Sequence, residues 1–109
     1  MVKLPENLKV IDNGIFRYCS NLEEVYIGKN LEIIDESAFI GCNKLKSIIV
    51  NDENKKFYST NSCLVDRTTK TLIVGLNVED GIVTIPDGIK TIARNAFYGR
   101  TSLKKISSL

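Results

Sequence analysis

Apolar side chains recur along this chain in a long repeating pattern, which neither one helix nor one strand would produce. Residues 8–16 align with residues 31–39 at an offset of 23 residues, and the match continues from Cys19 to Cys42. A self-similarity with a period of roughly 20–50 residues is typical of proteins built from stacked repeats. The pattern therefore predicts a repeat protein.

A third copy of the pattern covers residues 89–97, which lie 58 residues after the second copy. That separation is two periods of 23 residues and 12 further residues, so it indicates one irregular unit with an insertion. We predict a single domain over residues 1–109, with regular units at about 4–27, 28–50 and 82–109 and the irregular unit at about 51–81.

Each regular unit ends in a short alternation of apolar and polar residues, as at residues 22–27 and 45–50. Such a period of two is typical of a strand with one buried face. Residues 37–41 are too few for a stable free helix and end in a glycine, so they predict a single helical turn. One coil cannot bury its own apolar edge, and coils must stack. We therefore predict a solenoid of coils of about 23 residues, with a parallel β-sheet on one face and short helical turns opposite.

Three phenylalanines, Phe16, Phe39 and Phe97, share one position of the repeat. Because aromatic side chains bury large areas, we expect them to form a stack inside the solenoid. The position of Cys19 and Cys42 is taken by Arg100 in the last unit, so we expect that this position is not buried in every coil.

Composition limits the chemistry that the chain can perform. Hydrophobic residues make up 43% of the chain and charged residues 26%, which are ordinary globular values and exclude general disorder. A net charge of +2 is too small to indicate binding to nucleic acid or to an anionic membrane. The longest apolar run, residues 72–76, is far too short to cross a membrane, and residues 1–7 lack the apolar core of a secretory signal.

Candidate sites for catalysis and metal binding are weak. Since the chain has no histidine, Ser-His triads and His-ligated zinc are excluded, and we predict no cofactor and no enzyme activity. Cys19 and Cys42 would lie on stacked coils; we favour a buried ladder of free thiols over a disulfide, and a buried structural role for Cys63. Residues 51–54 are rich in side-chain oxygen atoms but lack the spacing of a calcium loop, so a solvated turn is predicted.

The residues resemble the BspA-like (Treponema-type) leucine-rich repeats of bacterial and protozoal surface proteins. The resemblance rests on the spacing of Leu, Ile, Ala-Phe and Cys over residues 22–27 and 31–45, and again over 82–86 and 89–103. The irregular middle resembles the insertion unit of that family. The resemblance implies that an Asn-x-x-Phe segment leads there into a hairpin, which would turn at residues 67–70.

One row of strand residues is a candidate binding face. Residues that alternate with the core aliphatic residues must point outward from the sheet, and these are Glu24, Tyr26, Ser47, Ile49, Lys105 and Ser107. Tyr26 and Ile49 would be apolar neighbours on an exposed sheet, which is the kind of anchor that protein interfaces use. The alternatives are ordinary surface hydrophobicity and contact with a flanking element outside this chain.

The resemblance implies a non-catalytic protein-binding module of a cell-surface or secreted protein, with adhesion to host or matrix proteins. The alternative is a set of spacer repeats that bind nothing themselves. An enzyme is the least favoured of the three classes. Because neither end carries a polar capping unit, we expect either an excerpt of a longer array or self-association through the open ends of the solenoid.

Overall fold

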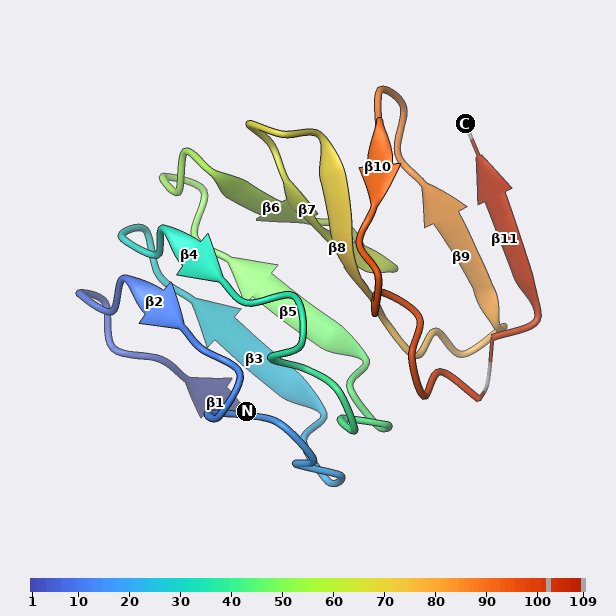
Figure 1. The fold of residues 1–109 in the computed structure, drawn as a ribbon, viewed down its shortest axis with the longest axis horizontal. Coiled ribbons are helices and arrows are strands. Elements are labelled where there is room, and N and C mark those ends of the chain that lie inside the picture. The colour runs from blue at the N-terminus through green and yellow to red at the C-terminus, as the bar shows by residue number, and fades with distance from the viewer. Residues whose placement is uncertain (102, 109) are drawn as a thin grey trace.

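A computed structural model describes residues 1–101 and 103–108 of the 109-residue chain. The described residues form short strands and no helix (Figure 1). In chain order the strands are β1 (Val2–Lys3), β2 (Val10–Ile11), β3 (Glu24–Ile27), β4 (Ile33–Ile34), β5 (Ser47–Val50), β6 (Phe57–Ser59), β7 (Cys63–Asp66), β8 (Thr71–Gly75), β9 (Ile82–Ile85), β10 (Thr91–Ile92) and β11 (Lys105–Ser108).

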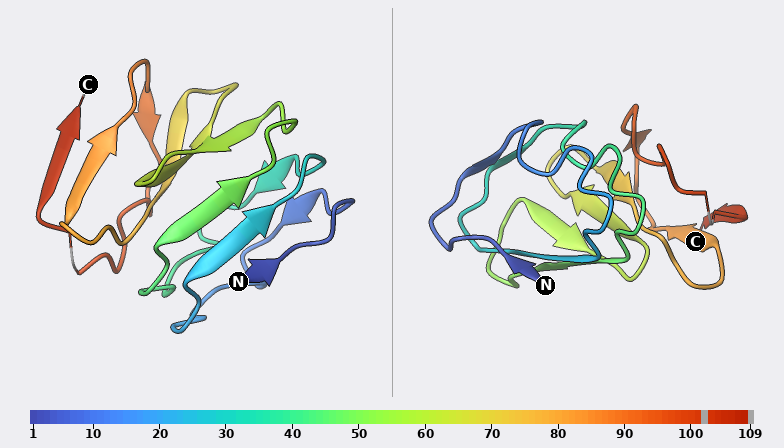
Figure 2. Two further views of the ribbon diagram at one scale, coloured as in Figure 1. Left: turned by 180° about the vertical axis from the view of Figure 1, so that it is seen from behind. Right: turned by 90° about the horizontal axis from the view of Figure 1, so that it is seen from below.

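Strands β1, β3 and β5 form a parallel sheet on one side of the coils. Val25 of β3 lies opposite Ile48 of β5, and Tyr26 lies opposite Ile49, so the register equals the 23-residue offset of the sequence repeat. The chain returns on the other side of each coil, where β2 and β4 pair in parallel (Figure 2). The predicted solenoid with parallel sheets is therefore confirmed.

The segments expected as helical turns form consecutive hydrogen-bonded turns instead. The Ala38 N–H donates to the Asp35 carbonyl at 3.0 Å, and the Cys42 N–H donates to the Phe39 carbonyl at 3.1 Å. Both bonds join residues three apart, and no helix forms among the described residues. A few residues between two strands can close such turns, but they are too short to propagate a helix.

One turn position of the repeat needs a left-handed backbone. Gly41 and Gly99 have φ angles of 81° and 75°, which glycine adopts at little cost because it has no Cβ. In the first unit Tyr18 takes this position with a φ of 62°. A Cβ at Gly41 would lie 2.4 Å from the Tyr18 ring, so the tyrosine of one coil needs the glycine of the next.

The irregular unit contains the predicted hairpin. Strands β7 and β8 pair in antiparallel fashion around the turn at residues 67–70, and β6 pairs with β7. On its other side β8 pairs in parallel with β10. Strands β9 and β11 then form a separate parallel pair. The insertion therefore divides the sheet face of the solenoid into the β1–β3–β5 sheet and the β9–β11 pair.

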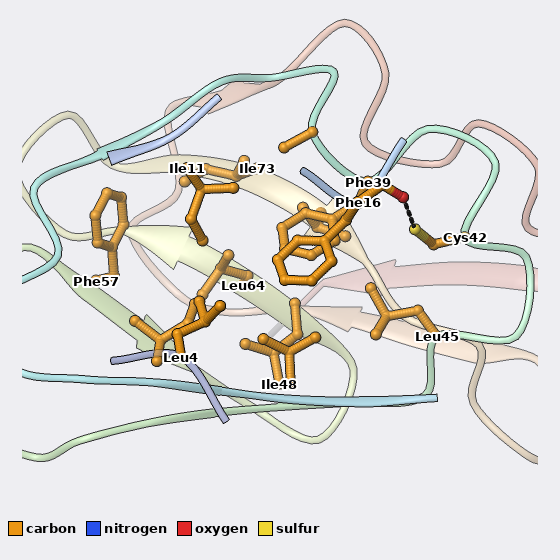
Figure 3. Packing of buried hydrophobic residues seen from close by; sticks show 14 of the residues in the cluster. Leu4, Ile11, Phe16, Phe39, Cys42, Leu45, Ile48, Phe57, Leu64 and Ile73 are labelled. Atoms are coloured by element: carbon orange, nitrogen blue, oxygen red, sulfur yellow. Dashed lines mark hydrogen bonds between the residues drawn. The ribbon is translucent and has the colours of Figure 1, made fainter. Parts of the chain in front are cut away.

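The main core lies between the two sides of the coils (Figure 3). Phe16 and Phe39 stack in it with ring centroids 5.5 Å apart and ring planes 9° apart. The prediction that Phe97 is the third member of this stack is wrong, because Phe97 packs against a second cluster and is only half-buried. Its ring lies against Gly75, where an added Cβ would approach within 2.4 Å of the ring. The inserted strand β8 thus takes the place beside Phe97 that a regular coil would fill.

Arg100 is also buried, with 6% of its surface exposed. Its repeat position is not buried in every coil, as expected, but the exposed residue at this position is Cys19 and not Arg100. Its guanidinium donates hydrogen bonds to the carbonyl oxygens of Gly75 at 2.6 Å and Cys42 at 3.0 Å. The buried guanidinium is tolerated there because its N–H groups find carbonyl acceptors.

Candidate functional site

The strands β3 and β5 present the centre of the candidate face. Val25 and Ile48 point inward and are buried, so their neighbours along each strand point outward. Tyr26 lies opposite Ile49 in the register, and the side chain of Ile49 is 44% exposed. The structure thus brings two apolar side chains together on the outer surface of this sheet.

Glu24 and Ser47 form the next outward pair, one step toward the amino-terminal ends of the same two strands. Both are partly exposed. The four residues form two rows across adjacent strands, one polar and one apolar.

Tyr26 is held in place on both sides. The Lys3 ammonium lies 5.4 Å from the centroid of the Tyr26 ring, and the Asn51 side-chain amide donates to the Tyr26 hydroxyl at 2.9 Å. A side chain that is already fixed loses little conformational entropy when a partner binds. The sequence pattern did not reveal the contacts of Lys3 and Asn51, because they depend on how neighbouring coils stack.

Lys105 and Ser107 lie on a different sheet from the other four predicted residues. They belong to β11, where they pair with Ile82 and Thr84 of β9. Ile82 is 40% exposed and was missed by the sequence reasoning, although the burial of Val83 beside it follows the same alternation. The predicted row is therefore two separate patches, one on the β1–β3–β5 sheet and one on the β9–β11 pair, and Figure 1 shows these two groups of strands apart from each other.

A hollow opens at the amino-terminal ends of β3 and β5, and we name it the strand-end hollow. Its lining includes the outward residues Glu24 and Ser47, so it is continuous with the candidate face. The full lining is Glu23, Glu24, Asn43, Lys44, Lys46, Ser47, Asn61, Asn77, Val78, Glu79, Asp80 and Thr101. Sequence reasoning missed this feature, because it depends on where the insertion places residues 77–80.

The predicted solvated turn at residues 51–54 is present in part: Asp52 and Glu53 are exposed and the Asn51 side-chain oxygen accepts from the Glu53 N–H, but Asn54 is buried. Its side chain is 3% exposed, and its amide nitrogen donates to the carbonyl oxygens of Gly28 at 3.0 Å and Leu31 at 3.2 Å. Its side-chain oxygen accepts hydrogen bonds from the backbone N–H groups of Lys56 and Phe57. Asn54 therefore fastens the start of the irregular unit to the preceding coil. In the described part of the chain, no group of three acidic, Cys or His side chains is placed to hold a metal ion.

The thiols differ in their exposure. Cys42 is buried and donates to the Phe16 carbonyl at 2.9 Å, and burial raises the pKa of this thiol. Burial likewise raises the pKa of Cys63, so both groups are protonated near neutral pH. Cys19 is exposed, so the expected buried ladder is wrong for this residue. All three thiols are free.

The carboxylates at equivalent repeat positions close turns. One carboxylate oxygen of Asp12 accepts from the Gly14 N–H at 2.9 Å, and Asp35 does the same for Ser37 at 2.8 Å. The Ser37 hydroxyl also donates to Asp35, and these hydrogen bonds from Ser37 lower the pKa of the Asp35 carboxyl. Hydrogen bonding of this kind stabilises a turn and needs no catalytic role.

The comparison with known structures supports the observed fold. A leucine-rich repeat protein from Eubacterium ventriosum, known from a crystal structure, is similar to 96% of this chain with a TM-score of 0.82. The two sequences are 24% identical, so the likeness shows the fold alone, and this chain spans 28% of that protein's chain. No curated protein matches this chain. The described residues of this chain include no helix with the length and apolar character of a membrane span.

The sequence itself matches a known repeat family. The BspA-type leucine-rich repeat region matches residues 1–64 and 77–108 in six copies. The unmatched residues 65–76 lie in the β7–β8 hairpin, where the repeat pattern is interrupted. Because the match covers most of the chain and agrees with the observed coils, this chain belongs to the BspA-type leucine-rich repeat family.

Proposed function

We propose that this chain is a non-catalytic protein-binding module of a cell-surface or secreted protein, and that it binds host or matrix proteins through its sheet face. The observation that carries the proposal is the pair of outward neighbours Tyr26 and Ile49. Interfaces favour aromatic anchors that are surrounded by polar groups. Glu24, Ser47 and Asn51 provide such polar surroundings for this pair.

The surface location and the adhesive role are what membership of the BspA-type family implies for this chain. A solenoid presents side chains along an extended sheet, so it can bind a protein without a deep pocket. The residues Lys105 and Ser107 on β11, with Ile82 of β9, form a second patch that a large partner would also contact.

Binding to an immobilised chain tests this proposal. A panel of matrix proteins and whole host cells is applied to the wild type and to a Tyr26→Glu, Ile49→Lys double variant. We expect the variant to lose at least about thirtyfold in affinity, since even one anchor residue of this kind contributes about 2 kcal/mol or more, which is roughly thirtyfold in Kd. Surface plasmon resonance on purified partners measures the change.

The matched control is an Ile33→Lys, Tyr98→Glu double variant, because Ile33 and Tyr98 are 53% and 57% exposed and lie outside the candidate face. It should bind as the wild type does, and both variants should melt within a few degrees of the wild type. Equal loss in both variants would contradict a role for this face. If the wild type binds nothing in the panel, the spacer function replaces the adhesive one.

We also propose that the isolated chain self-associates through its sheet edges. β1 and β11 each pair on one side only, and Val2 and Ile106 on these strands are 39% and 46% exposed. Unpaired strand edges with apolar side chains favour pairing with another copy. Light scattering should show a mass that rises with concentration, and a constant monomer mass up to millimolar concentration would contradict the proposal.

A further inference from the structure

The insertion creates a surface that a regular solenoid would lack. Strands β5 and β9 would be neighbours in an uninterrupted sheet, but here they belong to separate sheets. The segment that follows β8 fills part of the space, since the Leu76 N–H donates to the Ser62 carbonyl and the Asn77 N–H to the Leu45 carbonyl. Residues 77–80 of this segment line the strand-end hollow.

Negative charge predominates in the strand-end hollow, although the whole chain carries a net charge of +2. Its lining holds the carboxylates of Glu23, Glu24, Glu79 and Asp80 and the ammonium groups of Lys44 and Lys46. Lys46 pairs with Glu23 at 3.2 Å, so the excess charge rests on Glu24, Glu79 and Asp80 against Lys44. A hollow with this imbalance attracts a cationic side chain and repels an anionic one.

The spacing along β3 fits an extended partner. Glu24 borders the hollow and Tyr26 carries the apolar anchor, and both residues lie on the outer face of one strand. Residues two apart on a strand are separated by about 6.6 Å, and alternate side chains of an extended segment have the same separation. One extended segment can therefore place an apolar side chain on Tyr26 and Ile49 and the next side chain on that face beside Glu24.

We infer that the sheet face and the strand-end hollow together bind an extended protein segment with a lysine or arginine two residues from an apolar side chain. This inference rests on the proposed protein-binding function and names the chemistry of its partner. The apolar side chain lies on Tyr26 and Ile49, and the cationic side chain enters the hollow near Glu24 and Glu79. Charge complementarity selects the partner, and the apolar contact contributes affinity.

Titration of the ¹⁵N-labelled chain with two synthetic peptides tests the inference. The first is acetyl-Thr-Lys-Thr-Val-Thr-Lys-Thr-amide, and the second has glutamate in place of both lysines. With the lysine peptide we expect amide shifts at Glu24, Ser47 and residues 77–80, and a Kd that rises with salt concentration. The glutamate peptide should give no saturable shift. Equal binding of both peptides, shifts elsewhere on the chain, or no binding of the lysine peptide would overturn the inference.

Two charge-matched variants locate the contact. A Glu24→Gln, Glu79→Gln variant should weaken binding of the lysine peptide about three- to tenfold, as expected for the loss of two exposed ion pairs. A Glu32→Gln, Glu53→Gln variant changes the net charge equally, and neither residue lines the hollow. Equal effects of the two variants would show attraction to net charge alone and would overturn the inference.

The inference and the proposed function can fail separately. If a protein of the panel binds the wild type, and only the Tyr26→Glu, Ile49→Lys variant loses it, the sheet face is a binding surface. If the Glu24→Gln, Glu79→Gln variant then binds that protein as the wild type does, the cationic partner is excluded and the proposed function stands.

Discussion

Replacing Phe39 by alanine is expected to lower the free energy of unfolding by about 3–5 kcal/mol. The side chain is 3% exposed and its ring stacks on Phe16 at 5.5 Å between centroids. Alanine leaves a cavity between two coils, and each coil relies on its neighbour for burial of its apolar edge. Chemical denaturation followed by far-ultraviolet circular dichroism measures the loss as a lower midpoint at unchanged slope.

Two further substitutions show whether the effect arises from burial. Tyr98→Ala removes an aromatic ring that is 57% exposed, and it should change the free energy of unfolding by less than about 0.5 kcal/mol. Phe97→Ala removes a half-buried ring outside the stack. The loss in the free energy of unfolding should be larger than for Tyr98→Ala and smaller than for Phe39→Ala. A loss of less than about 1 kcal/mol for Phe39→Ala would show that this ring does not support the core.

The repeat offset predicted the fold well, because in a solenoid an offset in the sequence is also a register between strands. The pairing of Val25 with Ile48 needed no information beyond the 23-residue period. The β7–β8 hairpin could also be predicted from the sequence, since the family resemblance implied its turn. Local patterns and stacking agree in these parts of the chain, so the sequence reasoning succeeded there.

The same reasoning failed where equivalent positions in the repeat have different neighbours. Phe97 matches Phe39 in the sequence, yet its ring lies against Gly75 because strand β8 of the insertion is beside it. Asn54 appears in the sequence as one of several polar turn residues, and its burial results from contact with Gly28 and Leu31 of the preceding coil. A repeat alignment states which positions correspond, but an insertion decides what each position contacts.

The candidate face was likewise predicted only in part from the sequence. Strand alternation placed the side chains of Tyr26 and Ile49 on the outer surface of one sheet. It did not reveal that Lys105 and Ser107 lie on a separate pair of strands, or that a hollow opens at the amino-terminal ends of β3 and β5. Both features follow from the position of the hairpin, and no local pattern of polar and apolar residues encodes that position.

Arg100 joins three segments that the insertion brings together. Besides its bonds to Gly75 and Cys42, its guanidinium donates to the Tyr98 carbonyl at 3.4 Å. Neither ion pair of the described residues involves Arg100, and the hydrogen bonds of its guanidinium to Gly75, Cys42 and Tyr98 all end on carbonyl oxygens. Burial accordingly lowers the pKa of this guanidinium. In the regular coil the smaller Cys42 thiol at the same repeat position donates to one carbonyl, that of Phe16.

An Arg100→Met variant should lower the free energy of unfolding by about 1–3 kcal/mol, although methionine fills a similar volume. The reason is that the buried Gly75 carbonyl oxygen would lose the guanidinium as a donor, and the Cys42 carbonyl oxygen would keep only its hydrogen bond from the Leu45 N–H. Arg94→Ala, at an exposed position of the same unit, should stay within about 0.5 kcal/mol of the wild type. Denaturation midpoints measure both changes. If Arg100→Met were as stable as the wild type, Arg100 would act by filling space, and the hydrogen bonds to the two neighbouring segments would contribute nothing to holding the insertion against the coils.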